Sequence, residues 1–233
     1  MKKPYIKKFS KISNFNVWIV DGKYIRDNIN EEFTNYGQHY LFDFIPKNEF
    51  WIDKEGVPGE EKYYIDSMLV MNRLLAKGVS HAEAVRKADA IERRERSKSK
   101  LIKEEIKLEK QKDEIVDKVH KKLLKKFSSK KIKVWVVDGE LVRDLFFIDF
   151  TEGGHNKIYP FIPLNEVWID NDVENKEIKF VLIHELHERN LMAKGMDYDS
   201  AHKSSSEIEY SCRRNPEKLD KNLKAELEKN LND

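Results

Sequence analysis

The residues with the clearest capacity for chemistry lie in one short run near the C-terminus. Residues 180–189 read FVLIHELHER, with two histidines and two glutamates among apolar side chains. On a helix, His184 and Glu188 share one face because they are four residues apart. Imidazole nitrogen and carboxylate oxygen both bind zinc, at roughly 2.0–2.2 Å. The pair therefore predicts one side of a metal site, with Glu185 beside it and His187 on a more exposed face.

A further histidine follows on the next predicted helix, where His202 and Glu209 are two turns apart on one face. Gly195 ends the first helix, as a glycine just past a helix C-terminus does, and the short turn makes the two helices antiparallel neighbours. His202 then approaches His184 and Glu188. The alternative is a buried His184 that hydrogen-bonds a glutamate and binds no metal.

The run HELHE at residues 184–188 resembles the zincin metallopeptidases, whose hallmark is a helix carrying His-Glu-x-x-His with a third ligand on a following helix. The fifth position here is Glu188 rather than histidine. The resemblance covers at most residues 131–213. Two histidines and one carboxylate are an accepted ligand set for catalytic zinc.

The resemblance implies a role for each of these side chains. His184, Glu188 and His202 would hold Zn²⁺. Glu185 would not be a ligand and would take a proton from metal-bound water. The implied reaction is hydrolysis of a peptide bond, which makes the chain a candidate zinc metallopeptidase.

The resemblance also implies supporting roles for further residues. His155 follows two glycines and is a candidate additional ligand or oxyanion contact, and Tyr198 is a candidate donor to a developing oxyanion. His187 is expected at the surface, and Glu209 is expected to be structural or to lie outside the ligands. Residues 166–170 are expected to form a strand beside the cleft, where they would hold an extended peptide by strand addition.

The module that carries these residues is present twice. Residues 14–96 align with residues 131–213 without a gap, at a constant offset of 117 and with 29 identities in 83 positions. Matched motifs include WIVDG with WVVDG, and NEFWID with NEVWID. Such self-similarity indicates an internal duplication.

The first copy lacks the candidate site. The positions of the three proposed ligands and the proposed base are there occupied by Ser67, Met68, Met71 and Val85. Joint loss is what a shared site predicts, and apolar replacements indicate positions that face the interior. Glu209, by contrast, persists as Glu92, which indicates a structural or supporting role.

Each module is expected to be a small α+β unit of about 80 residues, a class in which strands and helices are segregated along the chain. A hairpin across Asp138-Gly139 and a turn at Gly153-Gly154 are expected, and Ser80 with Glu83 predicts a helix cap in the first copy. The strands and helices predicted for the second copy are 133–137, 140–143, 157–163, 166–170, 176–194 and 197–213.

A charged helix is expected between the modules, since apolar residues recur at helical spacing within the Lys- and Glu-rich residues 93–130. It predicts a solvated helix face or a contact for a partner. The full predicted organisation is a basic N-terminal segment 1–13, a degenerate zincin-like module 14–96, a charged helical linker 97–130, a zincin-like module with the metal site 131–213, and a C-terminal amphipathic helix 214–233.

The amino-acid composition and hydropathy of the chain exclude several classes of protein. With 39% hydrophobic and 37% charged residues, much of the chain must be solvated helix or linker. No run approaches the length of a membrane span, and the basic N-terminus has no apolar signal segment. We therefore expect a cytoplasmic protein of a prokaryotic cell or phage-infected host that is neither secreted nor membrane-bound. The single Cys212 excludes an intramolecular disulfide and a cysteine-based zinc site.

The balance of charged residues indicates which partners are expected. Lys+Arg 44 against Asp+Glu 42 gives a net charge of +2 and no overall attraction to nucleic acid. The expected partners are a protein or peptide substrate, and a second copy or another protein bound through the charged helix. Two alternatives remain open: a non-catalytic structural or interaction protein, and a nucleic-acid-associated accessory protein that acts through its Lys-rich spacer.

Overall fold

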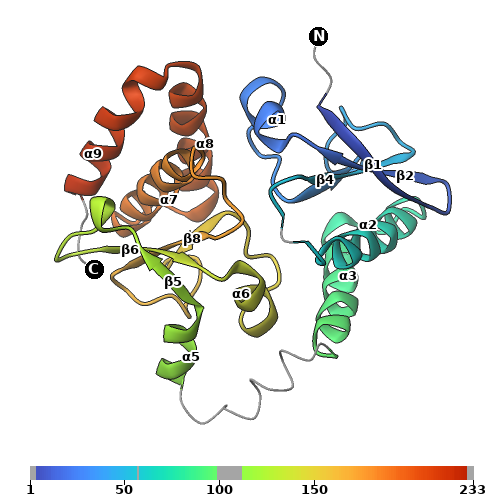
Figure 1. Cartoon of the computed structure of the whole chain (residues 1–233), viewed down its shortest axis with the longest axis horizontal. Helices are drawn as coiled ribbons and strands as arrows, with labels where there is room; N and C mark the ends of the chain where they lie inside the picture. The colour runs from blue at the N-terminus through green and yellow to red at the C-terminus, as the bar shows by residue number, and fades with distance from the viewer. Residues whose placement is uncertain (1–3, 57, 99–111, 230–233) are drawn as a thin grey trace. The chain divides into compact units, whose positions relative to one another are not determined.

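The computed structural model describes residues 4–56, 58–98 and 112–229 of the chain (Figure 1). The chain divides into two compact units. The first unit is Met1–Lys110 with Arg143–Ile148, and the second is Gln111–Val142 with Asp149–Asp233. Each unit is described by itself.

The first unit combines a four-stranded sheet with two long helices. Its elements are β1 (Tyr5–Ile12), β2 (Phe15–Val20), α1 (Gly22–Asn28), β3 (Tyr36–Gln38), β4 (Glu49–Asp53), α2 (Glu61–Leu75) and α3 (His81–Arg96). The strand order is β1-β2-β4-β3, with β2 and β4 parallel and the two outer pairs antiparallel. Ser80 caps α3 by accepting the backbone N–H of Glu83, as predicted.

The second half of the chain repeats this order of strands and helices and adds α5, two short 3-10 helices (η2 and η3) and a C-terminal helix. Its elements are α5 (Lys112–Val119), β5 (His120–Leu123), η2 (Lys125–Phe127), β6 (Lys133–Val137), α6 (Gly139–Leu145), β7 (Gly153–His155), β8 (Glu166–Asp170), α7 (Ile178–Ala193), α8 (Tyr198–Arg214), η3 (Pro216–Lys218) and α9 (Leu219–Lys229). They belong to the second unit, except that α6 from Arg143 onward is assigned to the first. The strand order is β5-β6-β8-β7, with the same pattern of parallel and antiparallel pairs.

The two units match element by element. The bounds of α1 and α6, of β3 and β7, and of β4 and β8 differ by 117 residues at both ends. The predicted α+β class is confirmed, and the gap-free alignment of the two sequences corresponds to the same order of strands in two sheets.

Helix α7 lies at the centre of the second unit. It packs against β7 and β8 and also against α8 and α9. Its buried side chains include Val181, Leu182, Ile183 and Leu186. A helix that is covered on several sides must be apolar around most of its circumference, which explains why the HELHE run stands among so many apolar residues.

The two helices that carry the site begin and end as the sequence predicts. Gly195 adopts a positive φ of 90°, and the backbone N–H of Met196 bonds the carbonyl of Leu191 to close α7. Asp197 caps α8 by accepting the N–H of Ser200. A tight, locally determined turn therefore connects α7 to α8.

The predicted hairpin at Asp138-Gly139 is wrong. Asp138 instead caps α6 by accepting the N–H of Leu141, and the antiparallel partner of β6 is β5. Glycine is required because a Cβ on Gly139 would lie 2.1 Å from the Asp170 carboxylate. The Asp-Gly pair thus reflects a helix cap and a close approach, both of which need the residue types of a hairpin turn.

The expectations for residues 153–163 are also corrected. Gly153 and Gly154 lie in strand β7 rather than in a turn, and the expected strand 157–163 is a series of turns, with the N–H of Tyr159 bonding the carbonyl of His155. A Cβ on Gly154 would lie 2.6 Å from the Tyr159 ring. Close packing rather than turn geometry explains this glycine.

The segments outside the two modules differ from the prediction where they are described. Residues 5–12, expected as a separate basic segment, form strand β1 of the first sheet. The helix expected to run to residue 130 ends at Val119, and His120–Leu123 pair with β6 instead. Residues 99–111 of this expected helix lie outside the described residues. Helix α9 (Leu219–Lys229) lies within the predicted C-terminal helix 214–233 and is preceded by η3, with Leu219 and Leu223 buried. Residues 230–233 of this prediction lie outside the described residues.

Among the described helices, none combines the length and apolarity that a membrane span requires.

Candidate metal centre

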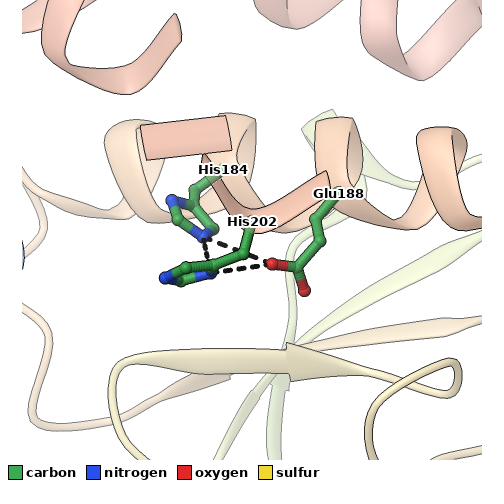
Figure 2. Close-up of side chains that lie close together, drawn as sticks. All are labelled: His184, Glu188 and His202. Atoms are coloured by element: carbon green, nitrogen blue, oxygen red, sulfur yellow. Dashed lines mark hydrogen bonds and ion pairs between the residues drawn. The ribbon is translucent and has the colours of Figure 1, made fainter. Parts of the chain in front are cut away.

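Three side chains on two neighbouring helices converge on one point (Figure 2). His184 and Glu188 are one turn apart on α7, and His202 is in the second turn of α8. Figure 2 shows the two imidazoles and the carboxylate directed toward one another. The sequence-predicted ligand set is therefore brought together within one unit.

The donor atoms form a compact triangle. His184 Nε2 lies 3.2 Å from His202 Nδ1 and 3.7 Å from Glu188 Oε2, and the latter two atoms are 2.9 Å apart. A point in their plane is about 1.9 Å from all three, and tetrahedral zinc with bonds of roughly 2.0–2.1 Å needs ligand atoms about 3.3–3.4 Å apart. The spacing therefore fits one face of a zinc tetrahedron.

The ionised carboxylates around this triangle favour positive charge at its centre. Burial alone would raise the pKa of Glu188, but hydrogen bonds from His155 and His202, together with the nearby His184, hold this pKa far below its ordinary value. Burial alone would lower the pKa of His184, but Glu188 and Glu209 raise it well above its ordinary value. Without a metal, protons supply the positive charge; a metal ion would replace them.

The three side chains of the triangle differ in their exposure to solvent. The Glu188 side chain is 4% exposed and that of His184 is 13% exposed, whereas that of His202 is 35% exposed. The ring of Tyr198 stacks on His202 with centroids 5.4 Å apart. Solvent or a substrate would therefore approach past His202 and Tyr198.

His155 contacts the ligand cluster from the side of the sheet. It is fully buried in β7, and its Nε2 lies 3.0 Å from Glu188 Oε1. Its Nδ1 accepts the backbone N–H of Lys157 at 3.2 Å. A neutral imidazole that accepts at Nδ1 carries its proton on Nε2, so His155 donates to Glu188. Burial lowers the pKa of His155, which favours this neutral form.

The tautomer of His155 also decides whether a second group of side chains could bind a metal ion. Oxygen and nitrogen atoms of His155, Glu185 and Glu188 also lie within 4.8 Å of one another. The Nε2 atom of His155 is protonated, however, and a metal ligand needs a lone pair there. His155 is therefore placed to orient Glu188 rather than to bind an ion itself.

Glu185 lies next to the proposed ligands, on the side of α7 that packs against strand β7. A Cβ on Gly153 would lie 3.1 Å from Glu185 Cγ, so this glycine of β7 makes room for the glutamate. The first unit has Tyr36 at this position, and Tyr36 stacks on Tyr64. Burial raises the pKa of Glu185 to about 8, with a further upward contribution from Glu188.

The other predicted residues occupy different positions. His187 is turned away from the ligands: its Nδ1 lies 2.9 Å from Glu226 Oε1 and its Nε2 lies 3.0 Å from Ser204 Oγ. It is half-buried rather than at the surface. Glu209 Oε2 lies 3.0 Å from His184 Nδ1, behind the ligand.

The predicted peptide-binding role of residues 166–170 is wrong. These residues form β8, which is paired with β6 on one side and with β7 on the other. A strand with both edges paired cannot accept another strand. In the described part of the second sheet, β7 is the edge strand beside β8.

Tyr159 lies near Glu185 and Tyr198, a position that the sequence patterns did not predict. Burial raises the pKa of its hydroxyl above the ordinary value, and the nearby Glu185 and Tyr198 raise it further. The residue at its position in the first copy is Phe42. A hydroxyl that is present only in the copy with the ligands was the signal that could have identified it.

The first unit has no comparable cluster among its described residues. Ser67 and Met71, the counterparts of His184 and Glu188, are buried, and the Ser67 hydroxyl donates to Glu92 Oε2 at 2.5 Å. Met68, the counterpart of Glu185, is fully buried in the apolar core. At these positions the first unit has buried packing residues where the second has the donor cluster, and the strand order is the same in both units.

Comparisons with family models, with curated proteins and with solved structures find no match to this chain.

Proposed function

We propose that the second unit is a zinc-dependent hydrolase that cleaves peptide bonds. The observation that carries the proposal is the triangle of His184 Nε2, Glu188 Oε2 and His202 Nδ1, whose sides of 2.9–3.7 Å suit a zinc ion. Three protein ligands leave a fourth position for water, as hydrolytic zinc sites require.

The residues around the ligands supply the other parts of a hydrolytic site. A bound zinc ion lowers the pKa of its water toward about 7. Glu185 would accept the proton, and its position beside Glu188, where it is not required as a ligand, supports this role. Tyr198, beside His202, is the candidate donor to the oxyanion that forms on the substrate carbonyl.

The resemblance of the HELHE run to the zincin metallopeptidases points to a peptide as the substrate. Such a substrate would approach past His202 and Tyr198, because the side chain of His202 is 35% exposed and Tyr198 is 45% exposed. All three residues of strand β7, on the side of the sheet, are buried.

The proposal predicts that metal binding and turnover can be separated. Glu185→Gln should retain the wild-type zinc content and lose at least about 100-fold of peptide hydrolysis, in line with the contribution of a general base. His184→Ala should lose the zinc. Metal content is measured by elemental analysis of the full-length protein, and hydrolysis with unfolded casein and mixed fluorogenic peptides.

Matched controls come from the first unit. Ser67→Ala and Met68→Gln alter the counterparts of His184 and Glu185 and should leave zinc content and hydrolysis unchanged. Full hydrolysis by Glu185→Gln would reject the catalytic role of this residue. Zinc without any hydrolysis in the wild type would favour the non-catalytic alternative, in which the ion only stabilises the fold.

A further inference from the structure

The same arginine–glutamate pair is buried in both units. Arg213 donates from Nε and Nη2 to Glu209 Oε1, at 2.9 and 2.8 Å. In the first unit, Arg96 donates from Nε to Glu92 Oε1 at 2.9 Å. The pair is therefore part of the duplicated scaffold and does not require a metal site.

The second carboxylate oxygen distinguishes the two copies. Glu92 Oε2 accepts the hydroxyl of Ser67, whereas Glu209 Oε2 lies 3.0 Å from His184 Nδ1. The carboxylate has kept its place, and its partner differs. In the second unit the partner is one of the three proposed metal ligands.

We propose that Glu209, clamped by Arg213, is a positioning residue that holds the proton of His184 on Nδ1 and presents the Nε2 lone pair to the metal ion. An imidazole that donates from Nδ1 to a carboxylate is left with Nε2 as its ligand atom. His184 Nε2 is the atom that faces Glu188 and His202. The inference rests on the zinc site proposed above.

Because Arg213 donates two hydrogen bonds to Glu209, the substitution Glu209→Gln should fix the orientation of the new amide. In Glu209→Gln the amide oxygen must face the two donors of Arg213, so the amide NH₂ faces His184. His184 Nδ1 then has to accept a hydrogen bond, which moves the proton to Nε2 and blocks the metal. Glu209→Ala removes the partner but imposes no tautomer.

The two Glu209 variants should therefore rank in one order for metal affinity and in the opposite order for stability. We expect Glu209→Ala to weaken Zn²⁺ and Co²⁺ binding about 10–100-fold, the usual effect of losing such a partner, and Glu209→Gln to weaken it further. Glu209→Gln should nevertheless unfold at the higher temperature, since it fills the space and pairs Arg213. Affinity is measured on the full chain by competition with a chromophoric chelator, and stability by thermal unfolding without metal.

The first unit supplies the matched control. Glu92→Gln and Glu92→Ala disturb the equivalent contacts with Arg96 and Ser67 and should lower stability without changing metal affinity. Equal affinity of the wild type and Glu209→Gln would overturn the inference, as would an equal loss of affinity in the Glu92 variants. If wild-type protein binds neither ion, the proposed zinc site fails and the inference fails with it.

A third variant covers the case in which Glu209→Gln does not fold. Glu209→Asp keeps a carboxylate for Arg213 but withdraws it from His184, so metal affinity should fall while the fold is retained. Unchanged affinity in that variant would also overturn the inference.

Discussion

At the scale of single residues, the site is defined by what stands behind each ligand. In the proposed zinc site Glu188 would bind through Oε2, while its Oε1 accepts a hydrogen bond from His155. His184 would face the ion with Nε2, and its Nδ1 lies 3.0 Å from Glu209 Oε2 on the other side of the ring. Partners of this kind fix the orientation of a ligand before the metal arrives, which lowers the cost of binding it.

The first prediction concerns the partner of Glu188. His155→Ala leaves Glu188 Oε1 buried without its donor, and we expect metal affinity to fall about 10–100-fold. His155→Gln, whose amide can donate in place of Nε2, should lose less. Chelator competition measures both, and Gln38→Ala in the first unit is the control. Wild-type affinity in His155→Ala would contradict the orienting role.

At the scale of elements, α9 is fastened to α7 and α8 through one buried carboxylate. Glu226 accepts hydrogen bonds from His187 and Asn190 of α7, and His187 also contacts Ser204 of α8. Burial alone would raise the pKa of Glu226, but these bonds and Lys229 lower it to about 2. The C-terminal helix thus depends on an ionised side chain.

The second prediction is the pH dependence that follows. Because the folded pKa of Glu226 lies below its ordinary value of 4.5, its ionised form stabilises the unit above pH 4.5, and this contribution is lost as the pH falls toward 2. This shift in pKa corresponds to at most about 3 kcal/mol of stability. Urea unfolding from roughly pH 1.5 to roughly pH 6, a range that includes both pKa values, should give a flatter curve for Glu226→Gln.

An exposed glutamate provides the comparison. Glu217, in η3, is exposed, and Glu217→Gln should reproduce the wild-type curve. If Glu226→Gln and the wild type lose stability in parallel on acidification, the ionised carboxylate does not contribute as we infer.

At the scale of the whole molecule, one fold is present with and without a ligand cluster. The helices α2 and α7 begin at matched positions, and the buried arginine–glutamate pair is present beside both. The first unit fills the ligand positions with Ser67, Met71 and Val85. The duplicated scaffold therefore forms with and without the cluster of donor side chains that the proposed metal site requires.

The third prediction is that the site can be built into the first unit. The combined substitutions Ser67→His, Met71→Glu and Val85→His place the three ligand types on α2 and α3, with Glu92 behind position 67. We expect the metal content to rise from about one to about two ions per chain, with stoichiometry measured by elemental analysis and titration. Each single substitution should leave it at about one.

A variant that also carries His184→Ala tests the location of the added ion. It should bind about one ion, held in the first unit. A folded triple variant that takes up no additional metal would mean that the scaffold lacks a feature that the second unit possesses.

The sequence determined the duplication, the two long helices and the set of donor residues. These signals are local or repeated: a 3.6-residue period places His184 and Glu188 on one face, and Gly195 and Asp197 fix the turn that leads to His202. The α+β class followed from the same patterns. Side chains close along the chain reveal their shared face without knowledge of the rest of the fold.

Tertiary structure decided which strands pair and what each polar atom meets. Asp138-Gly139 has the composition of a hairpin but caps a helix, because β5, a distant segment, supplies the antiparallel partner of β6. His187 and His184 are three residues apart, yet one contacts Glu226 of α9 and the other Glu209 of α8. Strand pairing and hydrogen-bond partners join residues far apart along the chain, so local patterns do not specify them.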